Sequence, residues 1–192
     1  MKKGMSAPAS EKRREEIWFE QALTALRDLG SVGQASAEYI KRHRIRLGFS
    51  RQKHSGASWF DWRRLRYGVF LSVRHAGRKP DNRYLCSLLA HEVKHLEQGL
   101  LEALSVRGEL VAWQLQYDIL TQPPAKALSD AWEELRALDR GSRADLKRAQ
   151  VLMKEVGGPG YRIDWLPLWP LPAEVAYRLT AAARRFCRFW RA

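Results

Sequence analysis

The sequence predicts an α+β fold: a small, mainly antiparallel sheet packed on two helices, followed by a helical C-terminal extension. Three observations predict it. Apolar residues recur at helical spacing over residues 11–29 and again after residue 81. Short segments between residues 45 and 74 alternate apolar with polar side chains. Helix and strand patterns are grouped along the chain, which disfavours repeated βαβ units.

The chain opens with two predicted helices. Residues 11–29 place Trp18 and Leu26 on one face, and Gly30 ends the pattern. After a segment rich in glycine and serine, a second short helix is predicted for residues 35–42.

Three strands follow. They are predicted for residues 45–51, 57–64 and 66–74, and in the third every second residue from Tyr67 to Val73 is apolar. The sequence QKHSG between the first two strands predicts a hairpin connection.

The remaining elements are helical with one exception. The predicted helices cover residues 81–99 (capped by Asp81 or Asn82), 105–121, a helical hairpin around Gly141, and 173–192. Residues 157–172, rich in proline and tryptophan, are predicted to be extended. We therefore expect a core over residues 11–122 and a helical extension over residues 123–192.

Composition restricts the classes of protein. A chain of 192 residues with 45% hydrophobic content can bury one main core. Its two cysteines, Cys86 and Cys187, can build neither a disulfide framework nor a cysteine-ligated zinc site, and they fit a reducing, cytoplasmic location. No N-terminal secretory signal and no run near the roughly 20 apolar residues of a membrane span is expected.

The net charge of +13 invites a polyanionic partner, either nucleic acid or an anionic membrane surface. The C-terminal helix mixes Phe186, Phe189 and Trp190 with arginines and could make this contact. The alternative is a packing helix whose arginine face is simply solvated.

The sequence HEVKH carries a metal-binding pattern. On a helix, His91 and His95 lie about 40° apart and one turn along the axis, so both imidazoles can reach one ion. Glu92 falls on the same side, where its carboxylate can reach a metal-bound water without ligating the metal. Zinc would lower the pKa of that water toward about 7, and Glu92 would take its proton.

Catalytic zinc needs a third protein ligand if one position is to stay open for water. The favoured residue is Glu109, fourteen residues after His95 and in the first turn of the following helix, with residues 99–104 providing the reversal. Glu102, His75 and His54 remain alternatives.

HEVKH followed by GELVA resembles the zincin metallopeptidases of gluzincin type, among them the compact minigluzincins and the ImmA/IrrE-like peptidases, over about residues 45–120. The resemblance implies zinc held by His91, His95 and Glu109, with Glu92 as general base. It also implies that the strand at residues 66–74 lines the cleft and pairs with an extended peptide.

Two positions depart from the family pattern. Lys94 introduces a charge inside the motif, and Trp113 stands where an aspartate that orients a histidine is expected, so another group must orient the ligands. Four residues are candidates for stabilising the oxyanion: Tyr84, Tyr117, Tyr161 and His75.

The function expected from these residues is zinc-dependent hydrolysis of a peptide or protein substrate. The alternatives are a basic protein associated with nucleic acid or membrane whose zincin-like core is not proteolytic, and a scaffold without metal. The apolar segment Tyr161–Pro172 must dock on the protein. It either fills a groove beside the C-terminal helices or covers the metal site as a lid, with Tyr161 or Asp164 near the zinc.

Overall fold

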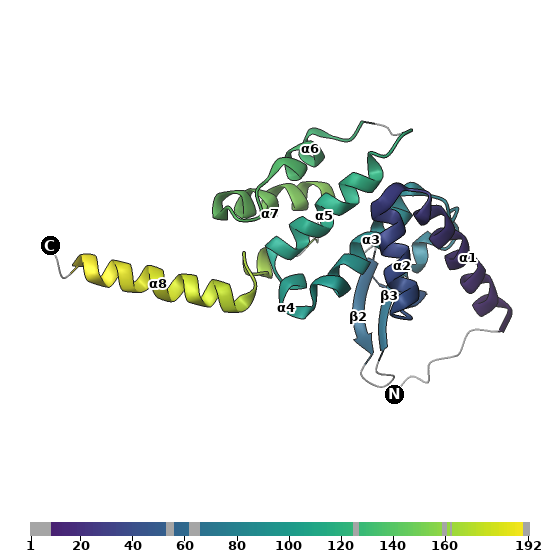
Figure 1. Ribbon diagram of the computed structural model, residues 1–192, viewed down its shortest axis with the longest axis horizontal. Coiled ribbons are helices and arrows are strands. Elements are labelled where there is room, and N and C mark those ends of the chain that lie inside the picture. The colour runs from purple at the N-terminus through teal and green to yellow at the C-terminus, as the bar shows by residue number, and fades with distance from the viewer. Residues whose placement is uncertain are drawn as a thin grey trace. The chain divides into compact units, whose positions relative to one another are not determined.

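The computed structural model describes residues 9–52, 56–61, 66–124, 127–158, 161 and 163–189, with the backbone alone for residues 9, 57–61, 66 and 182–189. Its elements follow the predicted order of helices, sheet and further helices, which confirms an α+β fold (Figure 1). The helices are α1 (Ala9–Arg27), α2 (Gly30–Arg42), α3 (Arg83–Gln98), α4 (Leu100–Ala103), α5 (Val106–Leu120), α6 (Asp130–Ala137), α7 (Arg143–Gly157) and α8 (Leu171–Phe189). The strands are β1 (Arg46–Ser50), β2 (Gly56–Asp61) and β3 (Arg66–Ser72), and single 3-10 turns form η1 (Val73–His75) and η2 (Ile163–Trp165).

The chain divides into two compact units. Unit 1 contains the residues up to Leu96 together with Leu115–Ala127, and unit 2 contains Glu97–Gln114 and the residues from Leu128 onward. Unit 1 therefore holds α1, α2, the sheet and most of α3. Unit 2 holds α4, the first turns of α5, and α6 to α8, so that α3 and α5 each contribute residues to both units.

The sheet of unit 1 is mixed, so the prediction of a mainly antiparallel sheet is wrong for one of its two pairings. The strand order is β1-β3-β2, with β1 parallel and β2 antiparallel to β3. Val69 and Leu71 of β3 are fully buried, and the central position buries such a strand best. The predicted hairpin between the first two strands is wrong because β3 lies between them; its connecting residues 53–55, and residues 62–65 of the second predicted strand, lie outside the described chain.

The core of unit 1 is formed by residues of α1, α2, α3 and the sheet, together with Ile119 of α5. Its main cluster contains Leu26, Ala37, Ile40, Ile45, Val69, Cys86, Leu89, Ala90, Val93 and Ile119. Burial, with a smaller contribution from the charge of Asp81, raises the pKa of the Cys86 thiol to about 11, so this cysteine stays protonated. The Asn82 carboxamide accepts the Leu85 N–H at 3.2 Å, so Asn82 makes the side-chain cap predicted for α3.

Unit 2 contains the helical hairpin predicted around Gly141. The hairpin, α6 and α7, buries Trp132, Leu135 and Leu146. The Gln114 side-chain amide of α5 donates to the carbonyl groups of residues 135, 136 and 138 at 3.0–3.2 Å. This amide satisfies the C-terminal carbonyl groups of α6, which would otherwise lack partners at the helix end.

The proline-rich segment of unit 2 docks on the start of α5. The carbonyl groups of Pro167 and Leu168 accept the N–H groups of Val106 and Arg107 at 2.9 and 3.0 Å, which supplies partners for the first turn of that helix. Leu168 is buried. The extended course predicted for residues 157–172 holds only in part, because η2 and the first residues of α8 interrupt it. Trp165 is also 80% exposed, although burial was expected from its apolar surroundings.

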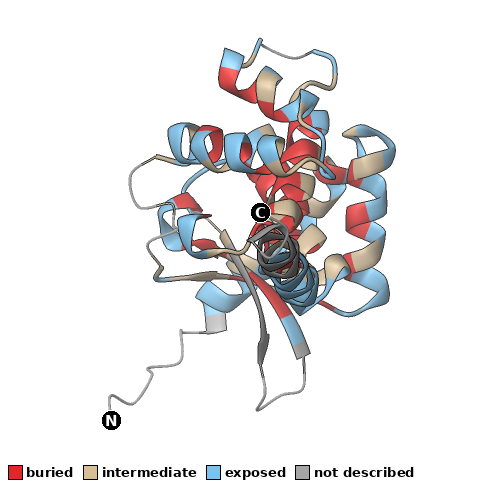
Figure 2. Cartoon of the chain, turned by 90° about the vertical axis from the view of Figure 1, so that its left-hand side faces the viewer, coloured by how far each residue is buried: buried red, intermediate tan, exposed pale blue. Residues whose placement is uncertain are grey.

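A buried ion pair fixes the start of α8, whose described side chains are otherwise mostly exposed (Figure 2). The Glu174 carboxylate is 3% exposed and accepts two hydrogen bonds from Arg143 at 2.9 and 3.0 Å and one from Arg178 at 3.0 Å. The Arg143 guanidinium also lies 4.3 Å from the centre of the Tyr177 ring. The Arg143 hydrogen bonds, followed by those of Arg178, lower the pKa of Glu174.

Glu174→Gln should lower the free energy of unfolding of unit 2 by about 2 kcal/mol, because it removes the charge that Arg143 and Arg178 share. The difference should be present at neutral pH and vanish as the pH falls through the lowered pKa of Glu174, below the value of about 4.3 of an unfolded chain. Urea unfolding at pH 7 and at low pH measures it. Glu134→Gln, which breaks the exposed pair with Arg148, is the matched control and should change stability little; equal losses in both variants would contradict this account.

Candidate metal centre

The two motif histidines converge on one point. His91 and His95 lie one turn apart on α3, and their Nε2 atoms are 3.1 Å from each other. Two nitrogen ligands of one tetrahedral zinc ion, each bonded at about 2.0 Å, stand about 3.3 Å apart. The observed separation therefore suits two imidazoles that share one ion.

Glu92 is 7% exposed and fills a space that only a glycine leaves open. A Cβ atom added to Gly56, the first residue of β2, would lie 2.6 Å from Glu92 Oε1. Gly56 thus makes room for the carboxylate that the motif marks as general base. The sequence signal for this role was a glycine at the start of a strand, which marks close approach of another group.

Glu109 lies in the first turn of α5, as predicted, and its carboxylate is oriented by two aromatic residues. The Tyr161 hydroxyl donates to Glu109 Oε2 at 2.5 Å. The Trp113 indole Nε1 donates in turn to the Tyr161 hydroxyl oxygen at 2.9 Å. The sequence predicts neither contact. It offers Tyr161 as a residue for the oxyanion or a lid, and it marks Trp113 only as a departure from the family pattern.

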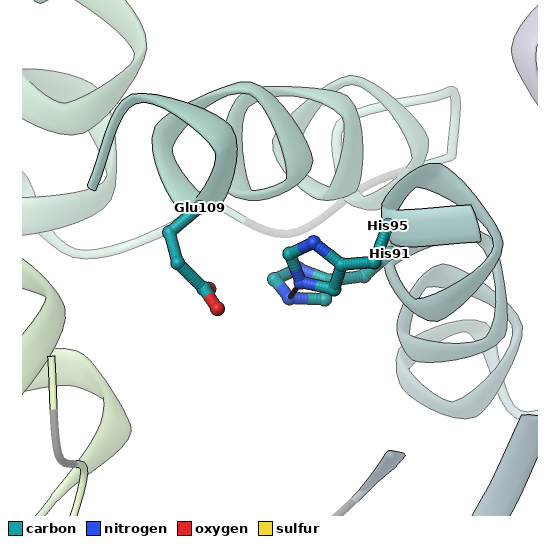
Figure 3. Close-up of side chains that lie close together, drawn as sticks. All are labelled: His91, His95 and Glu109. Carbon is teal, nitrogen blue, oxygen red and sulfur yellow. Dashed lines mark hydrogen bonds between the residues drawn. The ribbon is translucent and has the colours of Figure 1, made fainter. Parts of the chain in front are cut away.

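His91, His95 and Glu109 form a group that could hold a metal ion, since one ligand atom of each lies within 4.8 Å of the others (Figure 3). Two imidazoles and one carboxylate are a donor set of catalytic zinc. The 4.8 Å limit exceeds the 3.3 Å expected around bound zinc by about 1.5 Å, a distance within the reach of side-chain rotation.

The alternative third ligands do not join this group within the described chain. Glu102 of α4 instead accepts a hydrogen bond from Arg107 at 3.2 Å. His75 is buried beside Arg74; burial, followed by the charges of Arg74 and Arg78, lowers its pKa and keeps it neutral. His54 lies outside the described residues.

The candidates for the oxyanion and the lid differ in their surroundings. Tyr84 is partly exposed on the first turn of α3, whereas Tyr117 is buried on α5. Asp164 is 55% exposed and pairs with Lys154 at 2.6 Å. The oxyanion role stays a prediction for Tyr84, Tyr117, Tyr161 and His75.

The strand that was expected to pair with a peptide cannot do so. Both edges of β3 are occupied, one by β1 and one by β2, so the expectation for residues 66–74 is wrong. Within the described chain β2 has β3 as its one strand neighbour, and Gly56 at its start contacts Glu92. The edge of β2 is therefore the better place for strand addition.

Comparison with models of protein families, with curated proteins and with solved structures finds no match. The family resemblance therefore rests on the motif residues and their geometry. Among the helices of the described chain, none combines the length and the apolar character that crossing a bilayer requires. The polyanion contact predicted for the C-terminal helix stays a prediction, because the side chains from residue 182 onward are not described.

Gly56→Ala should leave the fold intact but displace the flexible end of Glu92, and it should lower about 100-fold any peptide hydrolysis that depends on this carboxylate. Initial rates on a mixed peptide substrate, with zinc analysis and circular dichroism of the same sample, measure this effect. Gly77→Ala is the control, since a Cβ there meets nothing within 4 Å. Unchanged turnover in Gly56→Ala would mean that the carboxylate position is not important.

Proposed function

We propose that the protein is a zinc-dependent peptidase of gluzincin type, with zinc on His91, His95 and Glu109 and with Glu92 as general base. The observation that carries the proposal is the convergence of the His91 and His95 Nε2 atoms at 3.1 Å, with Glu109 as a third donor in the same group. Glu92 lies between the two histidines in sequence and is buried beside Gly56.

Contacts within each unit support a shared site on α3 and α5. In unit 1 the Gln116 amide donates to the Ser87 hydroxyl at 3.3 Å. In unit 2 the Gln98 amide donates to the Gly108 carbonyl at 2.9 Å. Within unit 2, the last residue of α3 therefore contacts the first turn of α5. Glu109 directly follows Gly108, so it belongs to the stretch of α5 that meets the end of α3.

Each residue has one task in the proposed reaction. His91, His95 and Glu109 would hold the zinc ion, which would supply the acidification of a bound water and the polarisation of the scissile carbonyl group. Glu92 accepts the proton of the attacking water and later returns a proton to the leaving amine. The backbone of β2 would hold the substrate chain by hydrogen bonds along its edge, next to Glu92.

One equivalent of zinc should co-purify with the protein. His91→Ala and His95→Ala should lose it because each removes one of three ligands, and Glu109→Ala should bind it more weakly. Metal analysis by mass spectrometry, after dialysis against a weak chelator, makes the comparison. His43→Ala, an exposed histidine on the turn after α2, is the control and should keep full zinc. Full occupancy in Glu109→Ala would move the third ligand to another residue.

Glu92→Gln should keep the zinc and the fold yet lower peptide hydrolysis by about 10²–10⁴-fold, because glutamine has a similar shape but cannot accept the proton. Cleavage of a quenched peptide mixture, followed by mass spectrometry of the products, provides the measurement. Glu97→Gln, an exposed change on the same helix, should cleave at the parental rate. A zinc-loaded parent without cleavage would favour the alternative of a zincin-like core that is not proteolytic.

A further inference from the structure

We propose that Tyr161 is a positioning residue that holds the Glu109 carboxylate for the metal, and that the segment around it makes the third ligand dependent on the C-terminal extension. This inference rests on the proposed function and concerns how the third ligand of the same site is held in position. All the contacts that carry it lie within unit 2.

The direction of the hydrogen bonds is fixed by chemistry. An indole N–H can only donate, so in the 2.9 Å contact with Trp113 the Tyr161 oxygen is the acceptor. The single proton of the Tyr161 hydroxyl is then directed to Glu109 Oε2, 2.5 Å away. Such a contact restricts the orientation of the Glu109 carboxylate.

Packing holds this pair of donors in place. The Trp113 and Tyr161 rings lie nearly perpendicular, with centroids 5.8 Å apart. Trp113 also packs on Trp132 of α6, with centroids 4.8 Å apart. The aromatic contacts therefore restrict the angle at which the Tyr161 hydroxyl reaches Glu109.

The same segment also holds the backbone beneath Glu109. The carbonyl groups of Pro167 and Leu168 accept hydrogen bonds from the first N–H groups of α5. Ile163, which lies between Tyr161 and Pro167 in the sequence, is buried, and its carbonyl group accepts a hydrogen bond from the Gln150 side-chain amide. Tyr161 thus contacts the side chain of the third ligand, and Pro167 and Leu168 contact the helix turn that carries it. This arrangement serves as a clamp on Glu109.

The clamp also gives a role to Trp113, one of the two departures from the family pattern. Trp113 stands four residues after Glu109, where the family resemblance implied an aspartate that orients a histidine. Here that position carries an indole that acts through Tyr161 on the glutamate instead. In this chain the side chain at that position therefore helps to orient the carboxylate ligand, whereas the family pattern implies one that orients a histidine ligand.

The test is a double-mutant cycle on zinc affinity. Tyr161→Phe should weaken zinc binding about 10–100-fold, measured by competition with a chromogenic chelator, because it removes the hydroxyl that donates to Glu109 and keeps the ring. In a Glu109→Ala background the same substitution should have no further effect. Tyr177→Phe, the same change on α8 of the same unit, is the control and should bind zinc as the parent does.

Thermal unfolding of the metal-free variants separates positioning from simple stability. Tyr161→Phe should keep its cooperative transition, and the loss of affinity should exceed that in Tyr177→Phe. Parental zinc affinity in Tyr161→Phe, or equal losses with and without Glu109, would overturn the inference while His91→Ala still supports the zinc site. A parent that binds no zinc would overturn the proposed function and the inference with it.

Discussion

The contacts between α3 and α5 within each unit are the constraint on which the candidate site depends. Side-chain amides make these contacts at two places, Gln116 to Ser87 in unit 1 and Gln98 to Gly108 in unit 2. The acceptor is the Ser87 hydroxyl of α3 in the first contact and the Gly108 carbonyl of α5 in the second.

Two buried polar residues of α3 belong to the candidate site. His91 is 6% and Glu92 is 7% exposed, and the other buried residues of their helix are leucines, an alanine, a valine, Cys86 and Ser87. Removing a carboxylate from water costs several kcal/mol unless partners compensate for the lost hydration. A divalent cation beside the histidines would offset that cost for its neighbours, which gives a physical reason for burying these groups together.

The sequence predicted well those features that depend on local spacing. The helices were predicted from apolar residues that recur with a period of 3.6 residues, and the closeness of His91 and His95 follows from their spacing of one helical turn. Glu109 was found from its distance along the chain and the reversal before it. The order of the strands was not predicted, because strand neighbours depend on contacts between residues far apart in sequence. β3 lies at the centre of the sheet, where Val69 and Leu71 are buried.

The contacts that complete the site were beyond prediction for the same reason. Tyr161 lies 52 residues after its partner Glu109, and no periodicity connects a loop tyrosine to a helix turn. Gly56 was visible only as one glycine among the 13 of the chain, and its role appears once Glu92 is beside it. Such residues support the motif, whereas the motif itself is encoded within five positions.

The zinc-edge X-ray absorption spectrum of the purified protein tests the central claim most directly, since it reports the ligand atoms around the metal. The account predicts a four-coordinate ion with two imidazole nitrogens at about 2.0 Å, the remaining positions oxygen, and no sulfur. A shell of sulfur at about 2.3 Å, or six oxygens without imidazole scattering, would contradict it.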